Sequence, residues 1–252
     1  MTTRRRLGIV VYAPALVGND GRTLAIVHGM EKALPGLRLE WRVSEGGRPI
    51  ALPQRDAWLA ERTQDGRFPL LCNGDESYPV TVSGRGRSGR LSPGGQPRFE
   101  VHAEMPLDKP VIAAAAAVLE AVAESAHALW GEATPDDAAV DIAYQTAPTQ
   151  GGPPSPRRGL PALKLFEHIR SPEIPYYLGW LNYWSAGAAR TIGFPDTSRD
   201  AELLSRARRT ESGGWVVQLT DAPLDLDDRA HLDALKRAYE RFPEIGGRVT
   251  PR

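Results

Sequence analysis

The segment Phe99–Met105 alternates strictly between apolar and polar side chains, and it limits the folds open to this chain more than any other stretch. A period of two places alternate side chains on opposite faces of a β-strand. One face would carry Glu100, His102 and Glu104, and the other would be apolar. A strand with one polar face is typical of an antiparallel sheet that turns its other face toward a core.

Other segments extend the expected sheet. Leu37–Ser44 alternates in the same way, and several short apolar runs between turn residues indicate further strands. The strands that we expect are Leu7–Tyr12, Leu37–Ser44, Pro69–Asn73, Pro79–Ser83, Phe99–Met105 and Trp215–Thr220.

Helical periodicity marks the segments between these strands. The clearest helix is Asp108–Trp130, where an alanine-rich body follows an aspartate at the N-cap and a proline in the first turn. A last helix is expected to begin at Asp227 or Asp228 and to end at Phe242, with its apolar positions toward the core. The other expected helices are Arg22–Leu34, Arg55–Arg62, Thr134–Gln145 and Arg199–Arg209.

These patterns predict an α+β fold, with a mainly antiparallel sheet and helices packed chiefly on one face. Because no obvious linker divides the 252 residues, we expect a single domain over 1–252. The segment PTQGGPPSPRRG at 148–159 is rich in proline and glycine, so we expect a flexible, exposed loop there. We expect the arginine-rich stretch Gly84–Arg98 to form a second, mobile loop.

Charge and composition argue against several classes of protein. Lysine plus arginine equals aspartate plus glutamate at 31 each, so no overall field attracts nucleic acid or an anionic membrane. The turn GNDGRT lacks the glycine spacing of a dinucleotide site or a P-loop. No segment reaches the roughly 20 apolar residues of a membrane span. A single cysteine, Cys72, fits a reducing compartment. We therefore expect a cytoplasmic protein without a cofactor.

Ile174–Pro195, IPYYLGWLNYWSAGAARTIGFP, holds the densest group of aromatic residues in the chain. Large rings of this kind serve either as core packing or as a partner surface. If the block is a strand, Trp180 and Trp184 share one face, and Tyr177 and Tyr183 share the other. We expect the tryptophan face to be buried, and the two tyrosines to lie nearer the surface with their hydroxyls available to a partner.

Glu100, His102 and Glu104 would lie side by side, as an acid–base or metal-binding set requires. The same pattern is typical of the solvent face of any antiparallel strand. An enzyme of unknown reaction that uses this face is our alternative interpretation. It requires these side chains to line a concave pocket, with a further histidine or carboxylate nearby.

Three longer stretches carry a resemblance to a known family. They are RTLAIVHGMEKALPGLRLEWR at Arg22–Arg42, LGWLNYWSAGAARTIGFPD at Leu178–Asp196 and GGWVVQLTDAPLDLDDRAHLDALKRAYERF at Gly213–Phe242. Together they resemble a myxobacterial family of unknown function, numbered 5953, over nearly the whole chain. This resemblance implies no activity.

From Gly179 to the end, the order of GWLNYWS, a glycine pair before a strand, and an acidic turn before the last helix is also similar to the immunity protein 52 family. Members of that family neutralise a cognate toxin, typically a nuclease delivered between competing bacteria. The resemblance implies a non-enzymatic protein that occludes a toxin. It also implies that Trp180, Tyr183, Asp225 and Asp227 are structural signatures or part of the toxin-facing surface, to which the alternation adds Tyr177.

Overall fold

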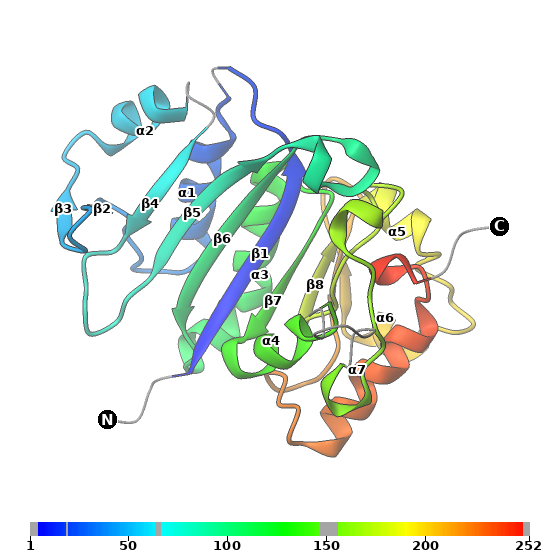
Figure 1. Ribbon diagram of the computed structural model, residues 1–252. Helices are drawn as coiled ribbons and strands as arrows, with labels where there is room; N and C mark the ends of the chain where they lie inside the picture. The colour runs from blue at the N-terminus through cyan, green and yellow to red at the C-terminus, as the bar shows by residue number, and fades with distance from the viewer. Residues whose placement is uncertain (1–4, 19, 64–66, 147–155, 249–252) are drawn as a thin grey trace.

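The computed structural model describes residues 5–18, 20–63, 67–146 and 156–248. These residues form one antiparallel sheet of ten strands in the order β3-β2-β4-β5-β6-β1-β7-β8-β10-β9 (Figure 1), which confirms the expected α+β class. The strands are β1 (Arg6–Pro14), β2 (Trp41–Val43), β3 (Pro49–Ala51), β4 (Phe68–Cys72), β5 (Thr81–Arg87), β6 (Arg98–Pro106), β7 (Trp130–Pro135), β8 (Leu181–Trp184), β9 (Ala207–Arg209) and β10 (Trp215–Gln218).

Two long helices, α1 and α3, pack against each other behind the sheet in the view of Figure 1. Gly29 permits their close approach, because a Cβ there would lie 3.1 Å from Ser125 Oγ and 3.3 Å from the Ala121 carbonyl oxygen. Asp108 caps α3 by accepting a hydrogen bond from the Val111 amide. The helices are α1 (Arg22–Ala33), α2 (Arg55–Thr63), α3 (Lys109–Ala126), α4 (Asp136–Ala143), α5 (Ala186–Thr191), α6 (Ala201–Ser205) and α7 (Arg229–Arg241). Among the described residues, no helix has both the length and the apolar content to cross a membrane.

The opposite side of the sheet, which we call the front face, is covered over only part of its width. Strand register places Glu100 opposite Tyr12, Tyr12 opposite Trp130, and Trp130 opposite Trp184, so these four side chains form one row across β6, β1, β7 and β8. Helix α7 lies in front of the part of the sheet that is formed by the C-terminal half of the chain (Figure 1). Phe242, directly after α7, places its ring centroid 5.2 Å from that of Trp184. This part of the front face is therefore buried in the core. We call it the covered half, and we call the rest of the front face the open half.

The structure corrects the expected helix Asp108–Trp130. Helix α3 ends at Ala126, because His127 adopts a left-handed conformation with a φ of 52°. The chain then enters β7, a central strand that the sequence analysis missed. All six residues of β7 are buried, so the strand lacks the alternation that identifies a half-exposed strand.

Smaller differences concern the ends of elements. The expected helix Arg199–Arg209 is wrong in its second half, where Ala207–Arg209 forms β9. Only Trp41–Val43 of the expected strand Leu37–Ser44 pairs with other strands, and the edge strand β3 was not expected. The remaining expected elements are present, with ends shifted by a few residues.

The two expected loops differ in outcome. The arginine-rich stretch is not a mobile loop: it comprises the end of β5, two short 3-10 turns, η1 (Gly89–Leu91) and η2 (Pro93–Gly95), and the first residue of β6. Most of 148–159 lies outside the described residues. Its last part forms the turn η3 (Arg157–Gly159), where the Arg158 guanidinium donates a hydrogen bond to the Asp141 carboxylate.

Candidate functional site

Three arginines surround Glu100 on the front face. Arg98 Nη2 lies 2.5 Å from Glu100 Oε1, and the Nε atoms of Arg85 and Arg87 lie 2.8 Å and 3.2 Å from Oε2. The Glu100 side chain is 4% exposed, whereas that of Arg85 is 57% exposed. A buried carboxylate requires donors of this kind to keep its charge. We call Arg85, Arg87, Arg98 and Glu100 the arginine cluster.

The cluster determines the protonation state of Glu100. Burial alone would raise the pKa of this carboxyl, but the neighbouring His102 and the guanidinium groups of Arg98 and Arg85 outweigh burial and hold the pKa well below its ordinary value. Glu100 therefore stays ionised near neutral pH. A general acid or base needs a pKa near the working pH, which Glu100 does not have.

The other two residues of the expected acid–base set lie in different surroundings. His102 Nε2 lies 3.7 Å from Glu100 Oε2, too far for a hydrogen bond, and this buried nitrogen has no hydrogen-bond partner in the part of the chain that the structure describes. Glu104 is exposed and pairs with Arg6 at 3.0 Å. Among the described residues, no group of three or more His, Cys, Asp or Glu side chains could hold a metal ion. The strand and its alternation are as expected, but the three side chains do not converge on one site.

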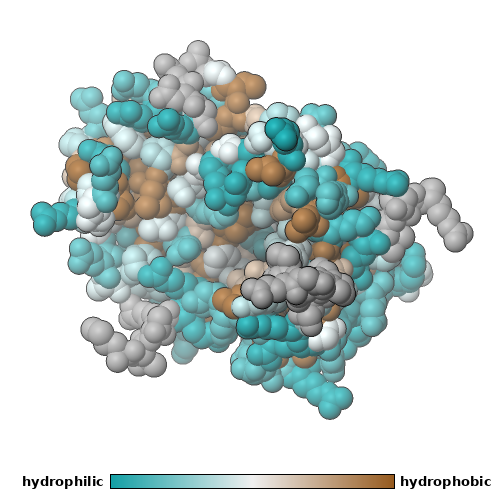
Figure 2. Space-filling model, viewed as in Figure 1, coloured by the Kyte–Doolittle hydropathy of each residue, from teal (hydrophilic) through white to brown (hydrophobic). Residues whose placement is uncertain are grey.

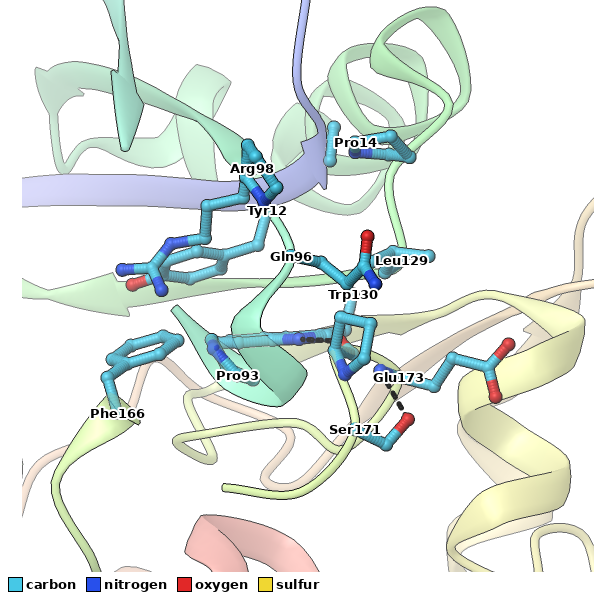
Figure 3. Close-up of a pocket in the computed structure, with 13 residues that line it drawn as sticks. Tyr12, Pro14, Pro93, Gln96, Arg98, Leu129, Trp130, Phe166, Ser171 and Glu173 are labelled. Atoms are coloured by element: carbon cyan, nitrogen blue, oxygen red, sulfur yellow. Dashed lines mark hydrogen bonds between the residues drawn. The ribbon is translucent and has the colours of Figure 1, made fainter. Parts of the chain in front are cut away.

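Beside the arginine cluster lies a pocket of about 380 Å³, which we call the front pocket (Figure 3). Its volume falls within the range of about 300–1,000 Å³ that is usual for ligand sites. Trp130 and Tyr12, from neighbouring strands, stack with ring centroids 4.0 Å apart. The Arg98 guanidinium carbon lies 3.8 Å from the ring centroid of Phe166 and 5.6 Å from that of Tyr12. Four prolines complete most of the lining: Pro14, Pro93, Pro97 and Pro172.

The polar groups of the front pocket are largely occupied. Arg98 donates through Nε and Nη2 to Glu100, and through Nη1 to the Leu91 carbonyl oxygen at 3.1 Å. Trp130 Nε1 donates to the Pro172 carbonyl oxygen at 3.2 Å. Figure 3 shows the Gln96 amide near the middle of the pocket lining, between Pro14 and Trp130. The pocket therefore presents the Phe166 ring, proline faces, the Gln96 amide and the side chains of Ser171 and Glu173 to whatever enters it.

The aromatic block divides differently from the expectation. Trp180 and Trp184 are buried, as predicted. Tyr183 is also buried, at 2% exposure, and its hydroxyl donates to Glu124 Oε1 of α3 at 2.7 Å. The expectation that Tyr183 lies near the surface is wrong because both faces of β8 are covered, one by α3 and the other by Phe242. Burial and the nearby Glu124 raise the pKa of Tyr183.

Tyr177 is half-buried, and its hydroxyl forms a hydrogen bond of 3.0 Å with Thr146 Oγ1. The hydroxyl of Tyr177 is therefore not free, and neither is that of Tyr183. A part for either tyrosine in partner binding stays a prediction.

The two acidic residues before the last helix mainly shape a turn. Asp225 Oδ1 accepts a hydrogen bond from the Asp227 amide at 2.9 Å. Asp227 is 85% exposed and pairs with Arg158 Nη1 at 2.8 Å, while Asp228 caps α7 by accepting from the Ala230 amide. These contacts explain the spacing of the aspartates without a partner. A role of Asp225 and Asp227 toward a partner stays a prediction.

Sequence reasoning missed Glu132, a second buried carboxylate on the front face. Its Oε2 accepts a hydrogen bond from Thr134 Oγ1 at 2.9 Å, and it has no ion pair with another described residue. Burial raises the pKa of Glu132 to about 7. The Gly179 backbone closes over it, since a Cβ there would lie 2.7 Å from Glu132 Oε2. No signal identified Glu132, because it lay in the short connection between two expected helices, Asp108–Trp130 and Thr134–Gln145.

Fold and site together define a class: an α+β protein whose antiparallel sheet has one half of its front face buried and presents an arginine cluster and an apolar pocket on the other. The chain belongs to the DUF5953 family, a domain of unknown function, whose family model matches residues 18–250. The match confirms the resemblance to family 5953, while the likeness to the immunity protein 52 family stays a prediction. No curated protein matches the chain.

Among solved structures, the chain is similar to the Pseudomonas aeruginosa T6SS protein PA0821. The TM-score is 0.55 at 17% sequence identity, and the match covers 94% of this chain and 76% of that chain. At this level of identity the likeness shows a shared fold alone.

Proposed function

We propose that this protein is a non-enzymatic, cytoplasmic binding protein of the immunity type, which neutralises a cognate bacterial toxin by occluding it. The observation that carries the proposal is the exposure of arginine side chains beside an apolar pocket on the front face. Arginine and aromatic residues around a pocket are enriched where proteins bind one another. The fold shared with a T6SS protein agrees with a role in bacterial competition.

The strand face with Glu100, His102 and Glu104 gives less support to an enzymatic function. Glu100 is held ionised by three arginines, and Glu104 lies in an exposed ion pair. A protein that acts by occlusion needs neither a titrating group nor a cofactor. It needs a stable surface, and the ion pairs of Glu100 provide rigid support for one.

The test begins with the products of the genes adjacent to the one that encodes this chain. We expect one of them to arrest bacterial growth when expressed alone, and co-expression of this protein to restore growth. The purified pair should form a complex at nanomolar concentration, and the toxin should lose its own activity in the complex. The resemblance to the immunity protein 52 family implies that this activity is that of a nuclease. If no adjacent product is toxic, or if the toxic product does not bind, the proposal is wrong.

One observation favours the alternative, an enzyme that uses Glu100, His102 and Glu104. The buried Nε2 of His102 has no hydrogen-bond partner among the described residues, and an unpaired buried polar atom is one of the features found at catalytic sites. A His102→Gln variant separates the two functions. Occlusion predicts full protection from the toxin by this variant, whereas an enzyme that inactivates the toxin chemically would lose protection while still binding.

A further inference from the structure

We infer that the front pocket and the basic surface around it bind an acidic protein segment, from which one uncharged apolar side chain, best an aromatic one, enters the pocket. The inference rests on the proposed function only in taking the toxin as the protein that carries this segment. It assigns the contact to the β5–β6 side of the sheet, and not to the aromatic block.

The charge of this surface is positive. The turns η1 and η2 lie against η4 (Phe166–His168), and the Gly94 amide donates to the Ile169 carbonyl oxygen at 2.8 Å. These contacts bring distant segments into one continuous surface. The segments that form it contain five arginines, Arg85, Arg87, Arg90, Arg98 and Arg170, against three glutamates, Glu100, Glu167 and Glu173.

Two of the arginines have donors to offer. Arg85 and Arg87 each donate to Glu100 through Nε, and their terminal nitrogens form no hydrogen bond with another described residue. A guanidinium group can bind a carboxylate through two parallel hydrogen bonds, which gives both strength and orientation. Because Glu100 already holds both side chains in place, a carboxylate from outside meets donors that are partly ordered before it binds.

Apolar side chains flank the same surface. Leu91 of η1 is 54% exposed, and Leu165, directly before η4, is 45% exposed. Figure 2 shows apolar residues set among hydrophilic ones over this upper middle part of the face. Exposed leucines around a pocket exclude water from a bound anchor side chain, as the rim of a protein–protein contact does.

The front pocket itself selects an uncharged group. All three nitrogens of Arg98 already donate to Glu100 or to Leu91, so the pocket wall has no free cation for an anion deep inside. A ring can instead lie against Phe166 and the proline faces, within a volume of about 380 Å³. The acidic groups of the partner then meet the arginines at the edge. A cationic partner surface would be repelled here.

The direct test uses a synthetic peptide with one tryptophan flanked by glutamates on both sides, titrated into the ¹⁵N-labelled full chain. We expect saturable amide shifts that cluster at Arg85, Leu91 and Trp130. Two control peptides carry glycine in place of the tryptophan or lysines in place of the glutamates, and each should bind at least tenfold more weakly. Shifts at other residues, or equal binding by the lysine peptide, would overturn the inference. So would tighter binding at these residues by a single-stranded oligonucleotide, which would identify the surface as one for nucleic acid.

Variants connect the surface to the toxin. Arg85→Gln removes an exposed donor, and Leu91→Ser removes an apolar rim contact that lies outside the arginine cluster, so the second variant stays informative if the first fails to fold. Each should weaken binding of both peptide and toxin by at least tenfold. The control Arg229→Gln, at a side chain that is 94% exposed on α7, should change binding less than twofold.

The outcomes separate the two proposals. If the toxin binds and neither variant weakens it, this inference fails while the proposed function stands. If the acidic peptide binds at this surface but no adjacent gene product is a toxin, the inference stands while the proposed function fails.

Discussion

Glu100 and Glu132 are both buried on the front face, with only β1 between their strands. Their surroundings shift the pKa values of the two carboxyl groups in opposite directions. Glu100 lies in the more open half, where three arginines hold its pKa well below the ordinary value. Glu132 lies in the covered half, where its side chain accepts one hydrogen bond from Thr134 and burial raises its pKa to about 7.

The difference follows from what covers each strand. In the open half Arg85 and Arg87 reach the buried Glu100 carboxylate through Nε while part of each side chain stays in water. In the covered half the Gly179 backbone lies so close over Glu132 that a Cβ there would be 2.7 Å from Oε2, which leaves no room for a solvated cation. Exposed charged side chains are therefore found in the open half, and close aromatic packing is found in the covered half.

The largest expected effect comes from breaking the packing of the covered half. Trp180 is 2% exposed, and its Nε1 donates to the Thr220 carbonyl oxygen at 2.9 Å. Trp180→Ala should lower the free energy of unfolding by about 3–5 kcal/mol, because it leaves a large cavity and an unpaired carbonyl group. Leu165→Ala in the open half is the control and should cost less than about 1 kcal/mol. Urea unfolding followed by circular dichroism measures both, and similar losses for the two variants would contradict the division into halves.

The next effect comes from breaking the arginine cluster. Glu100→Gln removes the only carboxylate that pairs with Arg98 among the described residues, and leaves a buried guanidinium without a counter-charge. We expect the free energy of unfolding at pH 7 to fall by about 3 kcal/mol. Glu104→Gln, in an ion pair whose side chains are about half exposed, should cost less than about 1 kcal/mol.

The pH dependence of the free energy of unfolding tests whether the charge of Glu100 stabilises Arg98. The folded-state pKa of Glu100 lies below its ordinary value of 4.5, so its contribution to stability is present above pH 4.5 and is lost as the pH falls below that value. Wild type and Glu100→Gln should therefore converge in acid. A stability difference that stays constant down to low pH would show that the carboxylate charge is not what stabilises Arg98.

The sequence predicted the open half better than the covered half, for a physical reason. The strand that carries Glu100, His102 and Glu104 has one polar face and one apolar face, so period two is visible in its sequence. The strand that carries Glu132 is buried throughout and follows an alanine-rich helix, so neither the strand nor its carboxylate was predicted. For the same reason Tyr183 was expected near the surface: alternation assigns faces correctly but does not reveal that both are covered.

The front pocket was beyond sequence reasoning because its parts are far apart along the chain. Tyr12, Arg98, Trp130 and Phe166 come together only through the strand order and the path of the chain after 156. The arginines were noticed as a basic stretch, but their order depends on Glu100 in the next strand. A contact between strands that is set by register has no local signature in either segment.

Removing the buried charge of Glu132 in the covered half should stabilise the protein. Glu132 has a pKa of about 7 in the folded chain against an ordinary value of 4.5, so the folded state binds the proton more tightly and stability falls as the pH rises through this window. Glu132→Gln keeps an oxygen for Thr134 and removes the charge. At pH 8 the variant should be more stable than wild type by about 2–3 kcal/mol, and below pH 4.5 the two should agree. Denaturant midpoints across this pH range measure the effect, and a variant that is less stable at pH 8 would show that Glu132 has a cationic partner after all.

The smallest effect tests whether Tyr183 belongs to the core or to a partner surface. Its hydroxyl donates to Glu124 Oε1 at 2.7 Å, and Ser212 Oγ donates to the same oxygen at 2.7 Å, so Glu124 keeps one donor when the tyrosine hydroxyl is removed. Tyr183→Phe should therefore cost only about 1 kcal/mol, the usual value of one hydrogen bond, and should leave toxin binding unchanged. Ser212→Ala, at the more exposed of the two bonds, is the matched control and should cost less than Tyr183→Phe. If Tyr183→Phe instead keeps full stability and weakens the complex tenfold, the hydroxyl meets the partner, and the covered half of the sheet takes part in recognition.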